Sequence, residues 1–206
     1  MINNYKKNLR LLKENSVYDE GMEHDACGVG LVASTEGVKS RKVVEYGIQA
    51  LKAVWHRGAI DADGKTGDGA GIHVEIPKDF FIEKIEITGH KYDGSELCVG
   101  MIFLPRNDYQ GQEQCRTIVE SELTKKNFNI YGWRQVPVNP SVLGEKAEQT
   151  RPEIAQVLFR HNDEKIIGKT LERALYETRR KIEKQALKNQ LNGFYICSRS
   201  EEHTSE

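Results

Sequence analysis

The chain has 206 residues, a length that suits one domain. Its 30 Lys and Arg side chains nearly balance 31 Asp and Glu side chains, which indicates no basic surface for nucleic acid. No apolar run approaches the ~20 residues that a membrane-spanning helix needs. The N-terminus lacks the apolar core of a secretory signal. These features predict a soluble cytoplasmic globular protein that binds neither nucleic acid nor a membrane.

Apolar patterning in the first half of the chain predicts two strands and one helix. The apolar run over residues 28–33 predicts a buried strand. Ser40 is a candidate N-cap for a helix that ends at residues 56–58. The apolar face of this helix would carry Val44, Ile48, Leu51 and Trp55. A Gly- and Asp-rich loop follows over residues 59–71, and the alternation of Ile72, Val74 and Ile76 predicts a half-buried strand that Pro77 ends.

The second half of the chain predicts more strands interleaved with helices. Strands are expected over residues 96–104, 128–138, 154–159 and from 194, and helices around residues 115–123 and over 164–187. The strand at 128–138 is interrupted by Gly132, and the inner face of the long helix would carry Ile167, Leu171, Leu175 and Ile182. This order leaves α/β and α+β architectures both open.

Both ends of the chain differ in character from the middle. Residues 1–26 are polar and charged, with one short apolar cluster. Residues 199–206 carry no apolar side chain and resemble the conceptual translation of a common sequencing adapter. We predict one domain over residues 27–198 and a non-native tail over residues 199–206.

Cys27 stands immediately before the sequence Gly28-Val29-Gly30, where glycines allow a close approach to the backbone. A thiol in this place is a buried structural cysteine, a metal ligand paired with His24, or a nucleophile. The other three cysteines, at positions 98, 115 and 197, are too far apart in sequence to indicate a zinc cluster or a disulfide framework.

Four further segments extend the pattern around Cys27. Cys27 itself lies in His24-Asp25-Ala26-Cys27-Gly28-Val29-Gly30. The four further segments are His56-Arg57-Gly58-Ala59, Thr66-Gly67-Asp68-Gly69-Ala70-Gly71-Ile72, Gly132-Trp133-Arg134-Gln135-Val136-Pro137 and Leu143-Gly144. Together they resemble the N-terminal glutaminase domain of the large subunit of glutamate synthases, which is a class II glutamine amidotransferase. The resemblance runs from about residue 16 to residue 198.

The resemblance implies an α+β fold of the N-terminal nucleophile (Ntn) hydrolase type, with four αββα layers and an incomplete C-terminus. It implies that residues 1–26 are a propeptide, cleaved between Ala26 and Cys27. Cleavage frees an α-amino group with a pKa of about 7.7 to 8.0, which can take the proton of the thiol. Cys27 would then attack the side-chain amide of glutamine, release ammonia, and leave a glutamyl thioester that water hydrolyses to glutamate.

The remaining site residues have competing interpretations. The resemblance places Arg57 beside the nucleophile, whereas a cation interacting with a helix C-terminus is the alternative. We interpret His56 as structural. Asp68 and Gly69 are candidate glutamine contacts in a pocket loop, and an ordinary surface turn is the alternative. Asp61 and Asp63 begin this loop as they would a calcium loop, but Lys65 replaces a ligand, Thr66 stands at the glycine position and Ile72 at the position of the closing glutamate. The glycine spacing does not fit a phosphate-binding motif either.

The resemblance also implies partners and cofactors outside these residues. Ammonia would pass to synthase domains of the same full-length chain for the reductive amination of 2-oxoglutarate. FMN and an iron–sulfur cluster would belong to those domains, and a small NAD(P)H-oxidising subunit or ferredoxin would supply electrons. The family's oxyanion-hole Asn-Gly pair would fall beyond residue 206, so we expect the isolated chain to be inactive. The alternatives are a free-standing glutaminase-like regulatory or scaffolding domain, and a structural domain with a buried Cys27.

Overall fold

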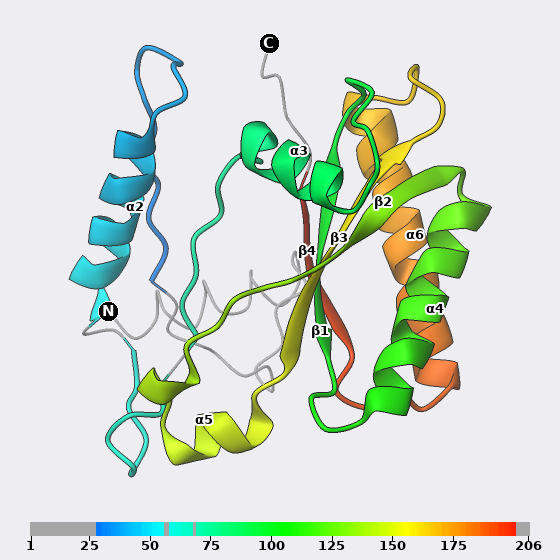
Figure 1. The fold of residues 1–206 in the computed structure, drawn as a ribbon. Coiled ribbons are helices and arrows are strands. Elements are labelled where there is room, and N and C mark those ends of the chain that lie inside the picture. Colours follow the sequence, from blue (N-terminus) through cyan, green and yellow to red (C-terminus); the bar gives the residue numbers. More distant parts are fainter. Residues whose placement is uncertain (1–27, 56–57, 68, 201–206) are drawn as a thin grey trace, which may run out of the picture. The chain divides into compact units, whose positions relative to one another are not determined.

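The computed structural model describes residues 28–55, 58–67 and 69–200, of which residues 197–200 are described by their backbone alone. These residues belong to two compact units (Figure 1). The first contains the described residues up to Ala59 together with those of Gly67–Ile72. The second contains Ile60–Thr66 and the described residues from His73 onward.

The first unit contains the predicted N-terminal helix. Helix α2 spans Arg41–Ala53, and the Ser40 hydroxyl caps it by accepting a hydrogen bond of 3.2 Å from the backbone N–H of Lys42. The helix prediction is therefore confirmed, although α2 ends a few residues before the predicted stop, part of which (residues 56–57) lies outside the described residues.

The strand predicted over residues 28–33 is wrong. The segment forms no strand, and the side chains of Val29 and Leu31 are 93% and 92% exposed. An apolar run becomes a strand only when a second segment pairs with its backbone groups. No described strand pairs with this segment.

The strand predicted over residues 72–76 is also wrong. These residues have no strand pairing, and the side chains of Ile72 and Val74 are 46% and 40% exposed, whereas Ile76 is buried. Helix α3, which spans Lys78–Ile87, follows immediately after Pro77 and was missed from the sequence. Its signal was the i, i+4 spacing of the buried Phe81 and Ile85.

The second unit is built on an antiparallel sheet of four described strands in the order β2-β3-β1-β4. The strands are β1 (Cys98–Leu104), β2 (Phe128–Gln135), β3 (Glu153–His161) and β4 (Tyr195–Ser200). All four strand predictions for this half of the chain are confirmed. The β2–β3 register shifts between Ile130 and Gly132, in agreement with the predicted interruption at Gly132.

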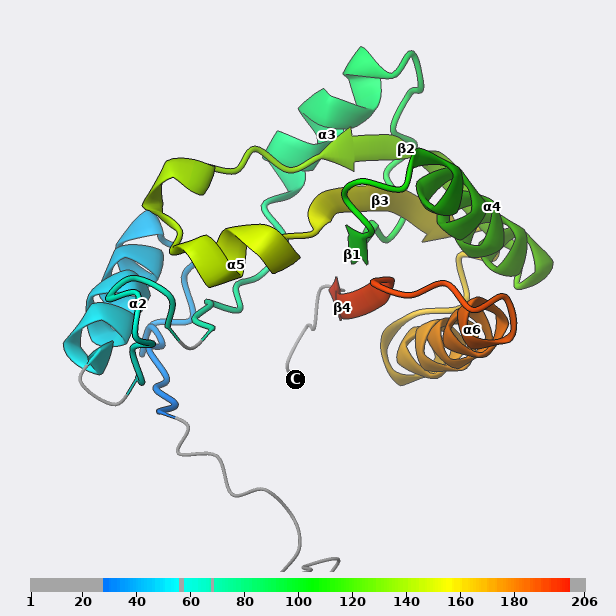
Figure 2. The ribbon, with the colours of Figure 1, turned by 90° about the horizontal axis from the view of Figure 1, so that it is seen from below.

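One face of this sheet is covered by two helices, α4 (Tyr109–Lys125) and α6 (Gly168–Lys188) (Figures 1 and 2). The main core lies between them and the sheet, with members from all of these elements: Cys98, Ile102, Leu104, Cys115, Val119, Leu123, Phe128, Ala155, Val157, Phe159, Leu171, Leu175, Ile182 and Ile196. Both helices were predicted. Ile167, predicted for the inner face of the long helix, is instead the N-cap of α6 and is 57% exposed.

The described residues of the second unit cover only part of the opposite face of the sheet. Helix α3 contributes Phe81 and Ile85 to a second cluster, which also contains Ile76, Leu97, Val99, Tyr131 and Leu158. Elsewhere on this face, Phe103 is half-buried and Tyr195, directly opposite it on β4, is 56% exposed. The arrangement of helices against an antiparallel sheet is α+β.

The connection between β2 and β3 contains a 3-10 helix, η2 (Pro140–Val142), and a short helix, α5 (Glu145–Thr150). Asn139 caps η2 by accepting a hydrogen bond of 3.2 Å from the backbone N–H of Ser141. No helix among the described residues is long and apolar enough to cross a membrane.

Candidate active site

Most of the predicted site residues lie outside the described residues. This holds for Ala26 and Cys27 at the predicted cleavage point, for Arg57, and for Asp68. Gly69 is described and is exposed, with open space where a Cβ atom would lie. The predicted glutamine contacts of Asp68 and Gly69 therefore stay predictions.

The glycines of the predicted pocket loop differ in their surroundings. A Cβ atom on Gly67 would lie 3.0 Å from the carbonyl oxygen of Ala59, whereas Gly69 and Gly71 have nothing within 4 Å. A contact of 3.0 Å is closer than a methyl group tolerates without a shift of its neighbour. The close backbone approach in this loop is therefore at Gly67.

The residues before Gly67 form a turn, residues 61–66, that we call the acidic turn. The Asp63 carboxylate accepts hydrogen bonds from the backbone N–H groups of Lys65 (2.9 Å) and Thr66 (2.7 Å) and from the Thr66 hydroxyl (2.5 Å). The backbone N–H of Asp61 donates to the Thr66 carbonyl at 2.7 Å, which closes the turn. Gly64 has φ +69°, a left-handed conformation that favours glycine.

These hydrogen bonds hold the pKa of Asp63 well below its ordinary value. The largest cause is the hydrogen bond from the Thr66 hydroxyl, followed by those from the backbone N–H groups of Lys65 and Thr66. The backbone N–H of Lys146, on helix α5, lowers the pKa further. Asp63 is therefore a carboxylate at neutral pH.

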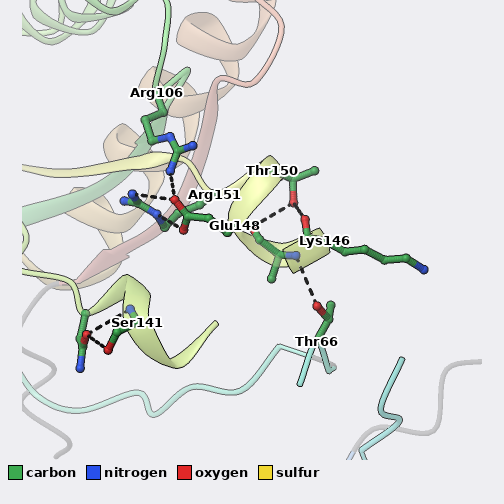
Figure 3. A network of polar contacts seen from close by, with 9 residues as sticks. Thr66, Arg106, Ser141, Lys146, Glu148, Thr150 and Arg151 are labelled. Atoms are coloured by element: carbon green, nitrogen blue, oxygen red, sulfur yellow. Dashed lines mark hydrogen bonds and ion pairs between the residues drawn. The ribbon is translucent and has the colours of Figure 1, made fainter. Parts of the chain in front are cut away.

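Helix α5 lies against the acidic turn (Figure 3). The Lys146 ammonium donates to both carboxylate oxygens of Asp61, at 2.7 and 2.8 Å. The backbone N–H of Ala147 donates to the Thr66 hydroxyl oxygen at 3.4 Å. Both aspartates that suggest a calcium loop thus face protein donors.

A second polar cluster joins α5 to the sheet (Figure 3). The Glu148 carboxylate accepts from Arg106, which follows β1, and from Nε and Nη2 of Arg151, which precedes β3, at 2.8 and 3.2 Å. The hydrogen bonds from Arg151 and then Arg106 lower the pKa of Glu148 to about 2. Glu148 is therefore charged at neutral pH and ties the end of β1 to the start of β3.

The described thiols do not compete with Cys27 as nucleophiles. Cys98 and Cys115 are buried and are not joined in a disulfide. Burial, with the nearby Asp108 carboxylate, raises the pKa of Cys115 to about 11, so it is a thiol rather than a thiolate at neutral pH. The described part of the chain holds no group of three His, Cys, Asp or Glu side chains placed for a metal ion. These residues do not fit an iron–sulfur cluster, which needs several convergent thiolates.

Sequence reasoning missed the contact between the acidic turn and α5. The pattern did single out Asp61, Asp63 and Gly144, but as a rejected calcium motif and as one segment of a family resemblance. The two regions are 81 residues apart at the Thr66–Ala147 hydrogen bond. The Asp63-Gly64 dipeptide was the available local signal for the turn, while no local signal reports a partner so distant.

Comparison with known families assigns the chain to a class. Residues 27–205 match the model of the class II glutamine amidotransferases, and the chain belongs to this family of Ntn hydrolases.

Individual relatives show which proteins with such a domain the chain is similar to. The chain is 50% identical over 196 residues to the "Glutamate synthase [NADPH] large chain" of Azospirillum brasilense, which covers 95% of this chain and 13% of that protein. It is 36% identical over 195 residues to a ferredoxin-dependent glutamate synthase of Pyropia yezoensis, covering 93% and 12% respectively. A Synechocystis ferredoxin-dependent glutamate synthase 2 is 37% identical over 177 residues, covering 85% and 11%. The chain thus spans about an eighth of the length of these relatives.

Proposed function

We propose that this chain is the glutaminase domain of a glutamate synthase, hydrolysing L-glutamine to L-glutamate and ammonia. The observation that carries the proposal is the starting point of the family match, residue 27. That residue is the cysteine predicted from the sequence to become the N-terminal nucleophile. The 50% identity to a glutamate synthase large chain supports this family member over other amidotransferases.

The chemistry follows from the two groups that a cleaved Cys27 would carry. Its thiol, with an unperturbed pKa of about 8.5, is only a few per cent thiolate at pH 7. The α-amino group freed by cleavage after Ala26 acts as the base that takes the thiol proton. The thiolate adds to the amide carbon of glutamine, ammonia leaves, and water then cleaves the thioester. Arg57, Asp68 and Gly69 are proposed to support the pocket for glutamine.

We also propose the complete four-layer αββα arrangement for the fold. The covered face of the sheet carries α4 and α6, which would form one outer helical layer. The half-buried Phe103 and the exposed Tyr195, whose rings are 6.3 Å apart, lie on the opposite face. An apolar face of this kind is suited to packing against a second sheet.

The proposed partners are the synthase domains of a longer chain, which would take the ammonia for reductive amination of 2-oxoglutarate. The electron donors named for two relatives are NADPH and ferredoxin. FMN and an iron–sulfur cluster are proposed to be held by those other domains, as the family resemblance implies. No step of glutamine hydrolysis proposed for this chain uses either group.

The decisive experiment is to produce the protein from its full reading frame and to determine its N-terminal residue by mass spectrometry. The expected residue is Cys27, and an active glutaminase that begins at Met1 or Ile2 would overturn the mechanism. Cys27 should also react with 6-diazo-5-oxo-L-norleucine, a glutamine-like electrophile, in a glutamine-protected manner. The Cys27→Ala variant should lose this labelling and glutaminase activity. Cys115→Ala is the matched control, expected to keep both.

A further inference from the structure

Three connections of the chain meet at one end of the sheet, within the second unit, and border a cavity of about 150 Å³. Because β1 runs antiparallel to both β3 and β4, the residues after β1 lie beside those that precede the other two strands. The cavity is lined by residues 104–107, 149–152 and 193. We propose that it is a binding site for a small carboxylate, held by the guanidinium groups of Arg106 and Arg151.

Both arginines have N–H donors that no described residue uses. Arg106 donates to Glu148 through Nη1 alone, and Arg151 donates to it through Nε and Nη2. A guanidinium carries five N–H donors, so Nε and Nη2 of Arg106 and Nη1 of Arg151 are left without an acceptor among the described residues. The two side chains are 25% and 19% exposed, and a dissolved ligand can therefore reach them while they are partly shielded from water.

Glu148 shows that these two side chains bind a carboxylate. Nε and Nη2 of Arg151 donate to its two oxygens, at 2.8 and 3.2 Å, and Arg106 adds a third donor (Figure 3). The planar fork of a guanidinium matches a carboxylate in this way. Two positive charges face one negative charge, and no Asp or Glu side chain of the described residues lines the cavity. One positive charge is thus left for a ligand.

The main chain on either side of the cavity is fixed by neighbouring residues. Gln112 on α4 is 8% exposed, and its Nε2 donates to the carbonyl oxygens of Pro105 and Arg106, at 2.9 and 3.2 Å. In the connection that precedes β4, a Cβ atom on Gly193 would lie 3.6 Å from the Cβ atom of Pro105, so these two connections are in contact. A site whose groups are already ordered loses less entropy when it binds a ligand.

The rest of the lining indicates what the carboxylate is attached to. Pro105 and Pro152 offer apolar surface, and Asn107 and Gln149 offer side-chain amides. A short carbon chain would contact the prolines, which a bare phosphate would leave without a partner. A cavity of about 150 Å³ in another protein is large enough for benzene. The ligand class is therefore an aliphatic carboxylate of a few carbon atoms.

The test measures how fast phenylglyoxal, a reagent for guanidinium groups, modifies each arginine of the protein produced from its full reading frame. Peptide mass spectrometry resolves the arginines in one sample, and succinate is the probe, compared with chloride at equal ionic strength. At about 20 mM, succinate should slow the modification of Arg106 and Arg151 about 3-fold, as a dissociation constant of about 10 mM implies. Arg173 on α6, whose side chain is 81% exposed, is the internal control and should react at an unchanged rate.

Three results would overturn the proposal. If succinate protects neither Arg106 nor Arg151, the cavity is not a carboxylate site. If inorganic phosphate protects both arginines as well as succinate does, the site recognises charge alone, and the assignment to an aliphatic carboxylate is wrong. If neither arginine reacts in chloride, their remaining N–H groups are closed to small molecules.

A variant tests whether both guanidinium groups hold the same ligand. Arg106→Gln removes one charge and should raise the succinate concentration that half-protects Arg151 about 10-fold, whereas Arg173→Gln is the matched control and should leave it unchanged. Cys115 is fully buried, so its alkylation by iodoacetamide reports a loss of folding. If Arg106→Gln makes Cys115 reactive, Arg106→Lys takes its place, because it keeps the charge and loses the planar fork. Undiminished protection of Arg151 in the folded variant would contradict a site built from both arginines.

Discussion

The two faces of the sheet differ in how completely the described residues of the second unit cover them. On β1, Ile102 points into the main core beneath α4 and α6 and is 1% exposed, whereas its neighbour Phe103 points to the opposite face and is half-buried. Near the other end of the strand, Val99 on that same opposite face is buried under α3. Alternation along a strand therefore assigns a side chain to a face, while the covering helices decide how much it stabilises the fold.

The largest expected loss of stability comes from a substitution on the face of the sheet that α4 and α6 cover. Ile102→Ala should lower the free energy of unfolding by about 2–5 kcal/mol, because it removes buried methyl groups and leaves a cavity. Urea unfolding of the protein measures the change. Phe103→Ala is the control on the adjacent position and the opposite face, and it should cost clearly less. Equal losses for the two variants would show that both faces are equally closed in solution.

The part of the other face under α3 should respond almost as strongly. Ile85→Ala should cost about 2–4 kcal/mol, since Ile85 is fully buried against the sheet. Ile87→Ala, on the same helix but 72% exposed, should stay within about 0.5 kcal/mol of the wild type. Thermal unfolding followed by circular dichroism compares the two. A neutral Ile85→Ala variant would mean that α3 does not close this part of the sheet.

The smallest effect concerns the charged cluster that ties both strands to α5. The folded protein lowers the pKa of Glu148 from 4.5 to about 2. A lowered pKa stabilises the fold above pH 4.5, and this stabilisation is lost as the pH falls toward 2. Glu148→Gln should therefore flatten the pH dependence of unfolding between pH 4.5 and 2. Glu145→Gln, at the start of α5, is the control, and an equal flattening there would contradict the assignment to Glu148.

The strands of the sheet could be predicted from the sequence because they combine apolar patterning with breaks at particular Pro and Gly residues. Pro105 ends the run that becomes β1, and Gly132 marks the irregularity of β2. The same patterning failed at residues 28–33 and 72–76, which are equally apolar or alternating but pair with no described strand. Pairing is a property of two segments, and neither segment alone contains the information.

In the candidate site, too, local motifs could be recognised from the sequence, whereas contacts between distant segments could not. The identity of Cys27 as a nucleophile and the glutamine contacts of Asp68 and Gly69 follow from motif resemblance and stay predictions, because residues 27 and 68 are not described. The close approach at Gly144 was not visible in the sequence, where this residue belonged only to the matching dipeptide Leu143-Gly144. It becomes interpretable once Asp63 and Thr66 are known to lie against it.

The strand order β2-β3-β1-β4 also determines how long β1 lacks its second partner strand while the chain is being synthesised. Strand β1 pairs with β3 on one side and with β4 on the other, and both partners are made long after it. Roughly 40 residues separate the end of β3 from the end of β4, which at about 5–20 residues per second takes on the order of 2 to 8 seconds. During that interval one edge of β1 is open to pairing with another nascent chain. Translation speed over residues 162–200 should therefore influence how much of the protein escapes aggregation.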